Sequence, residues 1–149
     1  MATTGKINGT IIGLYKVVTG TPDTFTKIAN GRSANFDLSV DMIETTEKDS
    51  GGFKEYIAGE KGGTFQFEGV LEYESSVSSQ GLSFDDLVTD ALAGTAFTIR
   101  WSSQSSGDQY MQSSVLISGV SGSAPNNDVA TFSCTMQMTG TITKGNVSA

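Results

Sequence analysis

The chain has 149 residues, of which 17% are charged and 37% belong to the apolar set, as expected for a single domain over residues 1–149. No apolar run reaches the roughly 18 residues of a membrane-spanning helix, and residues 1–6 lead into no secretory segment. We therefore expect a cytoplasmic product with no membrane partner. One cysteine and no histidine exclude an internal disulfide and remove the commonest metal ligand and general base, so neither a cofactor nor most hydrolase chemistry is expected.

Composition and charge also limit the fold and the partners. Eighteen glycines and many Ser and Thr residues form helices poorly but suit strands and turns. A net charge of −7 argues against a surface that grips nucleic acid, because phosphate binding needs a basic patch. Most of this charge lies in residues 62–149, where eight acidic residues face only Arg100 and Lys144.

The first regular element of the chain is a strand with an acidic face. Irregular apolar patterns before it predict strands at about Thr10–Val18 and Phe25–Ala29. Residues 36–42 then alternate, with one apolar face made of Phe36, Leu38, Val40 and Met42. Asp37 and Asp41 lie on the opposite face.

The segment Glu44–Gly63 is mixed in charge and interrupted by glycines, which predicts a loop of about twenty residues. Loops of this length in compact domains are usually functional or disordered. Because this one contains Phe53, Tyr56 and Ile57, we expect it to order against a partner. A short hairpin folded back on its own domain is the alternative.

A long half-buried strand is predicted from Thr64 to Glu74. Its two faces alternate, the apolar one with Phe65, Phe67, Leu71 and Tyr73, and the polar one with Gln66, Glu68, Glu72 and Glu74. Gly69 interrupts the apolar face, which predicts a bulge or a close backbone approach there.

One amphipathic helix and three further strands complete the predicted elements. Residues 83–93 carry apolar side chains at helical spacing, with Ser83 as the N-cap and Gly94 as the stop. Alternation predicts strands at Phe97–Trp101 and Ala130–Thr139, and a less regular strand is expected at Tyr110–Gly119, followed by a flexible connection over Gly119–Asp128. About seven strands and one helix predict a mostly β fold.

Catalytic and metal-binding patterns are weak. Glu72 and Glu74 lie two apart on one strand face, about 7 Å apart, a separation that suits a glycosidase pair. Alternating acids on a strand are, however, much more often a solvated face. Cys134 falls on an apolar strand face and is expected in the core, and no calcium-loop or P-loop motif occurs.

The block from Asp41 to Tyr73 resembles the major tail protein, or tail tube protein, of long-tailed bacteriophages and gene transfer agents. The resemblance rests on Thr46–Lys61, which reads TEKDSGGFKEYIAGEK, followed by a long strand that begins with a small residue. The short helix at Phe84–Leu92, the small-residue turn Ser121–Asp128 and the closing strand Val129–Gly140 also fit the family. The run is moderately specific, and the whole arrangement is more so.

The resemblance implies a β-sandwich flanked by one short α-helix, without enzymatic activity. Such subunits form hexameric rings that stack into a hollow tail tube, which delivers DNA to the host cell. Implied partners are further copies of the chain and the tape-measure, tail-tip and tail-terminator proteins, and DNA passes through the lumen without specific binding. Assembly in the bacterial cytoplasm and a final place in the virion tail follow.

The resemblance also gives roles to the residues singled out above. The candidate lumen-facing acids, which six copies would arrange into an anionic bore, are Asp37, Asp41, Glu68, Glu72 and Glu74. The same acids could instead face outward. The candidate contacts between subunits or rings are the loop residues Glu47, Lys48, Asp49, Phe53, Lys54, Glu55, Tyr56, Ile57, Glu60 and Lys61.

Three other functions stay open on the sequence. The tube could belong to a phage-derived injection or secretion machine that carries protein cargo. A carbohydrate-binding β-sandwich would need exposed aromatic residues on one face, for which Trp101 alone is too little. A glycosidase would lose activity on replacement of Glu72 or Glu74 with Gln.

Overall fold

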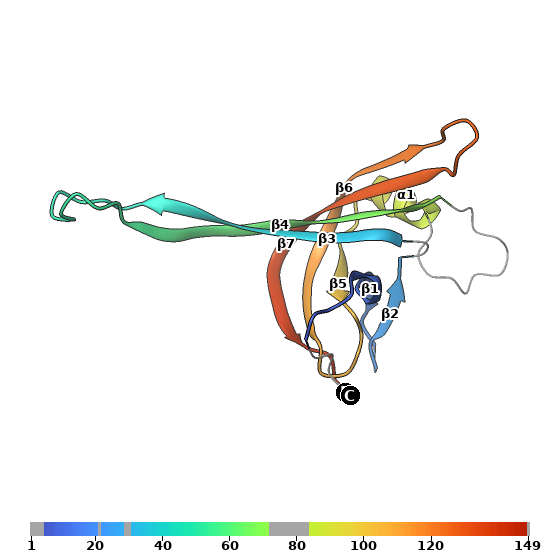
Figure 1. Ribbon diagram of the computed structural model, residues 1–149, viewed down its shortest axis with the longest axis horizontal. Coiled ribbons are helices and arrows are strands. Elements are labelled where there is room, and N and C mark those ends of the chain that lie inside the picture. The colour runs from blue at the N-terminus through green and yellow to red at the C-terminus, as the bar shows by residue number, and fades with distance from the viewer. Residues whose placement is uncertain (1–4, 21, 29–30, 72–83, 149) are drawn as a thin grey trace.

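The computed structural model describes residues 5–20, 22–28, 31–71 and 84–148. Its strands are β1 (Gly13–Val18), β2 (Thr24–Lys27), β3 (Gly31–Glu44), β4 (Tyr56–Val70), β5 (Phe97–Ser102), β6 (Gln109–Ser123) and β7 (Thr131–Asn146). A 3-10 turn, η1 (Gly9–Ile11), precedes them, and α1 (Phe84–Ala93) lies between β4 and β5. All seven strands belong to one antiparallel sheet in the order β2-β1-β5-β6-β7-β4-β3 (Figure 1).

The sheet curls until its two ends face each other. Trp101 on β5 meets Phe36 on β3 edge to face, with ring centroids 4.8 Å apart. The Trp101 indole N–H also donates to the backbone oxygen of Ala34 on β3 at 3.3 Å. The predicted sandwich is therefore confirmed, and its two layers are the two halves of one continuous sheet.

The space between the two layers holds the core. Within the body, every second side chain of β1, β4, β5, β6 and β7 points into it, as period-two alternation requires. The side chains with almost no exposure come from five strands, the residue after β2 and the helix: Leu14, Ile28, Phe65, Phe67, Leu87, Ile99, Val115, Phe132, Cys134 and Met136. Burying such side chains contributes about 1.5–3 kcal/mol each, which makes this cluster the main source of stability.

Helix α1 closes one side of the core against β6. Leu87 is fully buried, and the Phe84 and Phe132 rings lie 5.6 Å apart. Lys16 on β1 ties the helix to the sheet, since its Nζ lies 3.2 Å from the Asp90 carboxylate. The helix ends at Ala93, and Gly94 follows with a φ of +64°, the left-handed geometry of a glycine stop.

A buried cation fastens the short edge strand β2 on the outer side of the curl. The Arg100 guanidinium lies 4.3 Å from the centroid of Phe25 on β2 and 3.9 Å from that of Tyr110 on β6. Its Nε donates to Gln112 at 2.9 Å. Desolvation by burial lowers the pKa of Arg100, against the opposing effect of Tyr110 and Asp23. Stacking on two rings offsets part of the cost of burying this charge.

The hairpin of β3 and β4 is the most conspicuous feature of the molecule. β3 begins in the body and runs far beyond it, and β4 returns alongside β3 and ends in the body. Outside the body the two strands form an isolated two-stranded ribbon (Figure 1). We call residues 38–63 the arm. Its base is marked by Gly63, which is buried and whose Cα approaches the backbone oxygen of Asp37 closely.

All of the predicted strands and the helix are present, with shifted ends. β6 continues to Ser123, so the flexible connection predicted from Gly119 begins five residues too early. The irregularity expected at Gly69 lies on the opposing strand, where the register shifts between Gly31 and Ser33. The predicted Ser83 cap lies outside the described residues.

Gly63 tests how the arm is joined to the body. A Cβ at Gly63 would collide with the backbone oxygen of Asp37 and reach 3.0 Å from the Met138 sulfur. Gly63→Ala should therefore lower the free energy of unfolding by about 1–3 kcal/mol, measured by urea denaturation.

The neighbouring residue provides a matched control. Nothing lies within 4 Å of a Cβ built on Gly62, so Gly62→Ala should change stability by less than about 0.5 kcal/mol. Equal losses in the two variants would contradict the proposed close approach.

Candidate assembly surfaces

The arm replaces most of the predicted long loop. β4 begins at Tyr56, so the prediction of a loop over Glu44–Gly63 is wrong for residues 56–63, and only residues 45–55 connect the strands. The glycines at 59, 62 and 63 suggested a loop, but this segment forms part of β4 because its backbone pairs with β3. The hairpin alternative was right in topology but wrong in direction, because the hairpin points away from the body (Figure 1).

Local hydrogen bonds order the turn at the end of the arm. The Thr45 N–H donates to the backbone oxygen of Glu55 at 2.8 Å, and the Glu47 N–H donates to the Ser50 hydroxyl at 3.1 Å. Gly51 and Gly52 take φ values of +63° and +85°, which favour glycine. The turn is thus built without packing from the body.

A bulge gives the arm apolar side chains on both faces. Val40 pairs with Lys61 and Met42 with Ala58, so β4 has two residues where β3 has one. Met42 continues the apolar face of β3, whereas the paired Ile43 and Ile57 lie on the opposite face. Met42, Ile43 and Ile57 are 64%, 52% and 55% exposed. A lone two-stranded ribbon is marginal in water, and one that exposes apolar groups on both faces needs covering.

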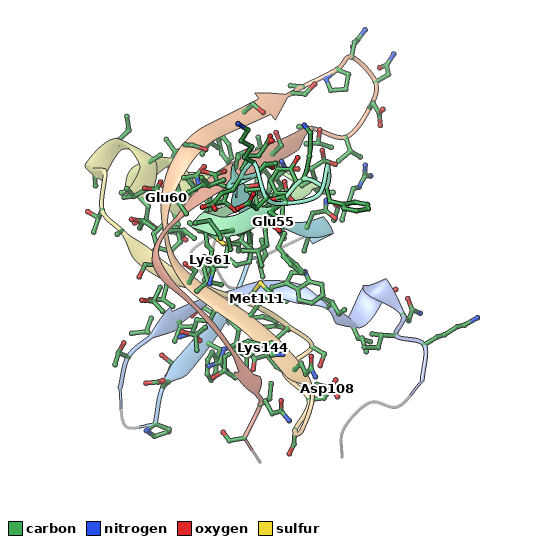
Figure 2. All side chains as sticks on the ribbon, turned by 90° about the vertical axis from the view of Figure 1, so that its left-hand side faces the viewer. Glu55, Glu60, Lys61, Asp108, Met111 and Lys144 are labelled. Carbon is green, nitrogen blue, oxygen red and sulfur yellow. The ribbon has the colours of Figure 1, made fainter. Side chains whose placement is uncertain are left out.

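The predicted contact residues all lie on the arm. Residues 47–49 and 53–55 belong to the turn, and the others lie on β4. Figure 2 looks along the arm, and its labelled residues Glu55, Glu60 and Lys61 lie in front of the body. The turn contains the ion pair of Lys54 with Glu44 at 3.6 Å and the 78% exposed ring of Phe53.

A polar face covers the convex side of β3, β4, β7 and the distal part of β6. Glu68 pairs with Ser33 and Ser133, and Asp37 pairs with Thr64, so the two acids share this face. The face continues through other small polar side chains, namely Asn35, Gln66, Thr135, Gln137 and Ser121. Among the described residues of this polar face, Leu116 is the one large apolar side chain that is exposed.

The other three predicted acids are placed differently. Asp41 is exposed but lies on the arm, at the bulge between Val40 and Met42. Glu72 and Glu74 lie outside the described residues. The glycosidase pair therefore has no described geometry, and of the three acids that the structure describes, Asp37 and Glu68 share the polar face of the body.

Two strand edges flank the polar face. Among the described strands β3 pairs only with β4, so its other edge has no strand partner there, and its Ala34 oxygen accepts from the Trp101 side chain. β5 pairs with β6 only as far as Val115, which leaves residues 116–123 of β6 paired with β7 alone among the described strands. Free edges of this length invite pairing with another chain. Sequence reasoning missed both edges, because strand order is not encoded in local alternation.

The metal-ligating and thiol side chains of the described part of the chain were candidates for chemistry. No group of three or more Cys, Asp or Glu residues there could hold a metal ion. Burial raises the pKa of the Cys134 thiol to about 11, so this thiol is protonated at neutral pH and is a core residue. None of the described helices is long and apolar enough to span a membrane.

Comparisons with known proteins agree with this geometry. A family model described as phage tail tube protein matches residues 8–144. No curated protein sequence matches the chain. Among solved structures, the fold is similar to the tail of an empty gene transfer agent particle determined with C6 symmetry, with a TM-score of 0.75, 17% identity, and coverage of 93% of this chain and 98% of that chain.

Two further structures have the same fold. The SPP1 tail tube matches with a TM-score of 0.72 at 9% identity, covering 97% of this chain and 81% of that chain. The baseplate of the anti-feeding prophage, determined with six-fold symmetry, matches with a TM-score of 0.61 at 10% identity, covering 99% of each chain.

The buried thiol gives a prediction about reactivity. With a pKa near 11 in place of 9.0, thiolate at Cys134 is about a hundredfold scarcer at pH 8 than in the unfolded chain. A thiol-reactive dye should therefore label the native protein at least about a hundredfold more slowly than the protein in urea. Similar rates in the two states would contradict the placement of Cys134 in the core.

Proposed function

This chain is a member of the phage tail tube protein family, and we propose that its copies form six-fold rings that stack into a hollow tube. Its role is structural. The observation that carries the proposal is a four-stranded section, β3-β4-β7-β6, with one polar face and two free edges. A closed ring of such sections gives each edge a partner and leaves one continuous polar wall.

Ring closure follows from the direction of the strands. Neighbours in the section are antiparallel, so β3 and β6 run in opposite directions. A copy rotated about the tube axis presents its distal β6 edge antiparallel to β3 of the first copy. The contact joins two different patches, so it is heterologous and closes only at a fixed number of copies. Six copies are supported by the C6 symmetry of the similar gene transfer agent tail.

The polar face is proposed to line the lumen. Asp37 and Glu68 then recur six times in every ring, among hydroxyl and amide side chains. Arg32 lies beside Glu68 in a hollow at the end of this face, so the two acids outnumber one cation and the wall offers phosphates no cluster of basic residues. DNA then passes without specific binding. The remaining candidate acids, Asp41, Glu72 and Glu74, are kept as candidates for the same anionic lining.

The arm is proposed to join one ring to the next. It extends beyond the body, where it cannot contribute to the body's own core, and its apolar faces are exposed in the free subunit (Figure 1). Docking on other copies covers Met42, Ile43 and Ile57. Stacking is a second heterologous contact, and because it does not close on itself it produces a filament.

The proposal extends to partners and compartment. We infer that the lumen holds a tape-measure protein during assembly, and that tail-tip and tail-terminator proteins bind the two ends of the tube. Assembly takes place in the bacterial cytoplasm, and the product is part of the virion tail. A non-enzymatic protein is supported by the family and by the protonated, buried thiol.

A tube that carries protein cargo is the second candidate. The similarity to the anti-feeding prophage baseplate favours it. The TM-score of that match, 0.61, is lower than the 0.75 of the match to the gene transfer agent tail. Particle morphology and neighbouring genes distinguish the two candidates.

Hydrogen exchange combined with negative-stain electron microscopy tests ring closure. Rings or tubes with six-fold end views are expected as the protein concentration rises. On assembly, the outward-pointing amides within residues 31–38 and 116–123, about every second one, should gain protection of at least about tenfold, because these amides acquire hydrogen-bond partners.

The internal control for that experiment is β7. Residues 131–137 are already paired with β4 and β6, so their exchange should change little. Assemblies in which both edges exchange as in the free subunit would contradict ring closure through β3 and β6.

Labelling at Gln66 tests which face lines the lumen. Gln66 is exposed on the polar face of β4, and Cys134 does not react, so Gln66→Cys introduces a single reactive thiol. In tubes, a small maleimide should label it, whereas a maleimide on a bulky polymer should react at least about tenfold more slowly than with free subunits, because it enters only at the ends. Equal polymer labelling of tubes and free subunits would place this face outside.

A further inference from the structure

A pocket on the body has the charge and shape to receive the turn of the arm. It has a volume of about 390 Å³ and lies between the N-terminal segment, the end of β2 and the start of β3. Its floor includes Ile12 and Phe67, and its polar lining includes Thr10, Asn35, Lys27 and Arg32. We call this the cationic pocket. No acidic residue lines it among the described residues, and neither cation has an ion-pair partner there.

The turn of the arm carries the complementary groups. Glu47, Asp49 and Glu55 form no ion pair among the residues that the structure describes, whereas Lys54 is engaged by Glu44. Phe53 stands among them with 78% of its surface exposed. We call these four residues, Glu47, Asp49, Phe53 and Glu55, the acidic tip. The exposed ring of Phe53 shares the turn with three carboxylates and with the exposed cation Lys48, so the turn keeps a negative balance that matches an apolar lining bordered by two cations.

The positions of the two features suit stacking. In Figure 1 the turn of the arm lies at one end of the long axis, and β3 begins on the far side of the body from it. The tip and the pocket therefore lie at opposite ends of one hairpin and cannot meet within one chain. A second copy displaced along that axis brings its tip toward the pocket of the first.

We propose that the acidic tip of one copy docks in the cationic pocket of another, with Phe53 on the apolar floor and the carboxylates beside Lys27 and Arg32. The inference rests on the proposed stacking of rings and adds the surface that receives the arm. Because the contact joins two different patches, it repeats without limit along the tube. The occupant is a second copy of this chain.

Disulfide trapping in the full chain tests the contact without requiring rings. Lys48→Cys places a thiol on the turn, Thr10→Cys places one at the pocket, and Asn126→Cys places one on the exposed β6–β7 turn as a control. The thiol of Cys134 is buried and does not compete. Mixing tip and pocket variants should give linked pairs at least about tenfold faster than mixing tip and control variants, because docking raises the local thiol concentration. Equal rates would overturn the proposal.

Charge reversal tests the same contact in assemblies. Lys27 lies on β2, outside the β3 edge proposed for ring closure. Lys27→Glu should therefore leave rings that do not stack, and adding Asp49→Lys should restore tubes. The matched control reverses one exposed cation elsewhere, Lys144→Glu, and should stack as the unaltered protein does. Figure 2 shows Lys144 on the body below the arm.

The outcomes separate this inference from the function on which it rests. Pocket-reversed protein that forms normal tubes would overturn the docking site while supporting the tube. Rings without stacking in the pocket variant, with tubes in the control, would support both. If the unaltered protein forms neither rings nor tubes, the trapping rates still decide whether tip and pocket meet, and equal trapping would again overturn the inference.

Discussion

The pairing of β3 with β4 runs from Gly31 opposite Gly69 to Glu44 opposite Tyr56, while the core of the body reaches only the first half of it. Backbone hydrogen bonds continue where side-chain burial stops. The hairpin therefore belongs to two environments: near the body it supplies Phe36, Phe65 and Phe67 to the core, and beyond Gly63 it exposes the same apolar face to solvent. The other elements complete the core of the body, and the distal part of β6 also presents a strand edge that has no partner among the described strands.

The strands and the helix could be read from the sequence because their signals are local. Alternation of apolar side chains at 65 and 67, or at 132, 134 and 136, places these residues in the core, and helical spacing marks Phe84 and Leu87. The arm could not be read in this way. Its glycines and mixed charges are typical of a loop, and only pairing with β3 holds residues 56–63 in a strand. Propensity was overridden by tertiary context.

The assembly surfaces were predictable to a smaller degree. Asp37 and Glu68 share a face because strand parity fixes it, and their joint placement needed only the register of β3 on β4. The free edge of β6, the contact of Phe36 with Trp101 and the pocket between Thr10 and Arg32 depend on strand order and on the curl of the sheet. Each of these three features joins segments that are far apart in the chain, so the periodicity of a single segment cannot predict it. The anionic character of residues 62–149 indicated a repulsive surface without indicating its shape.

Redox conditions differ sharply between the interior of a cell and the medium into which a particle is released. The chain has one cysteine, and it lies between the layers of the sheet with 1% of its surface exposed. Oxidants in the medium find no thiol to convert to sulfenic acid, and neighbouring copies cannot become covalently linked through it. Cysteine oxidation therefore cannot change the contacts that this chain makes with other copies.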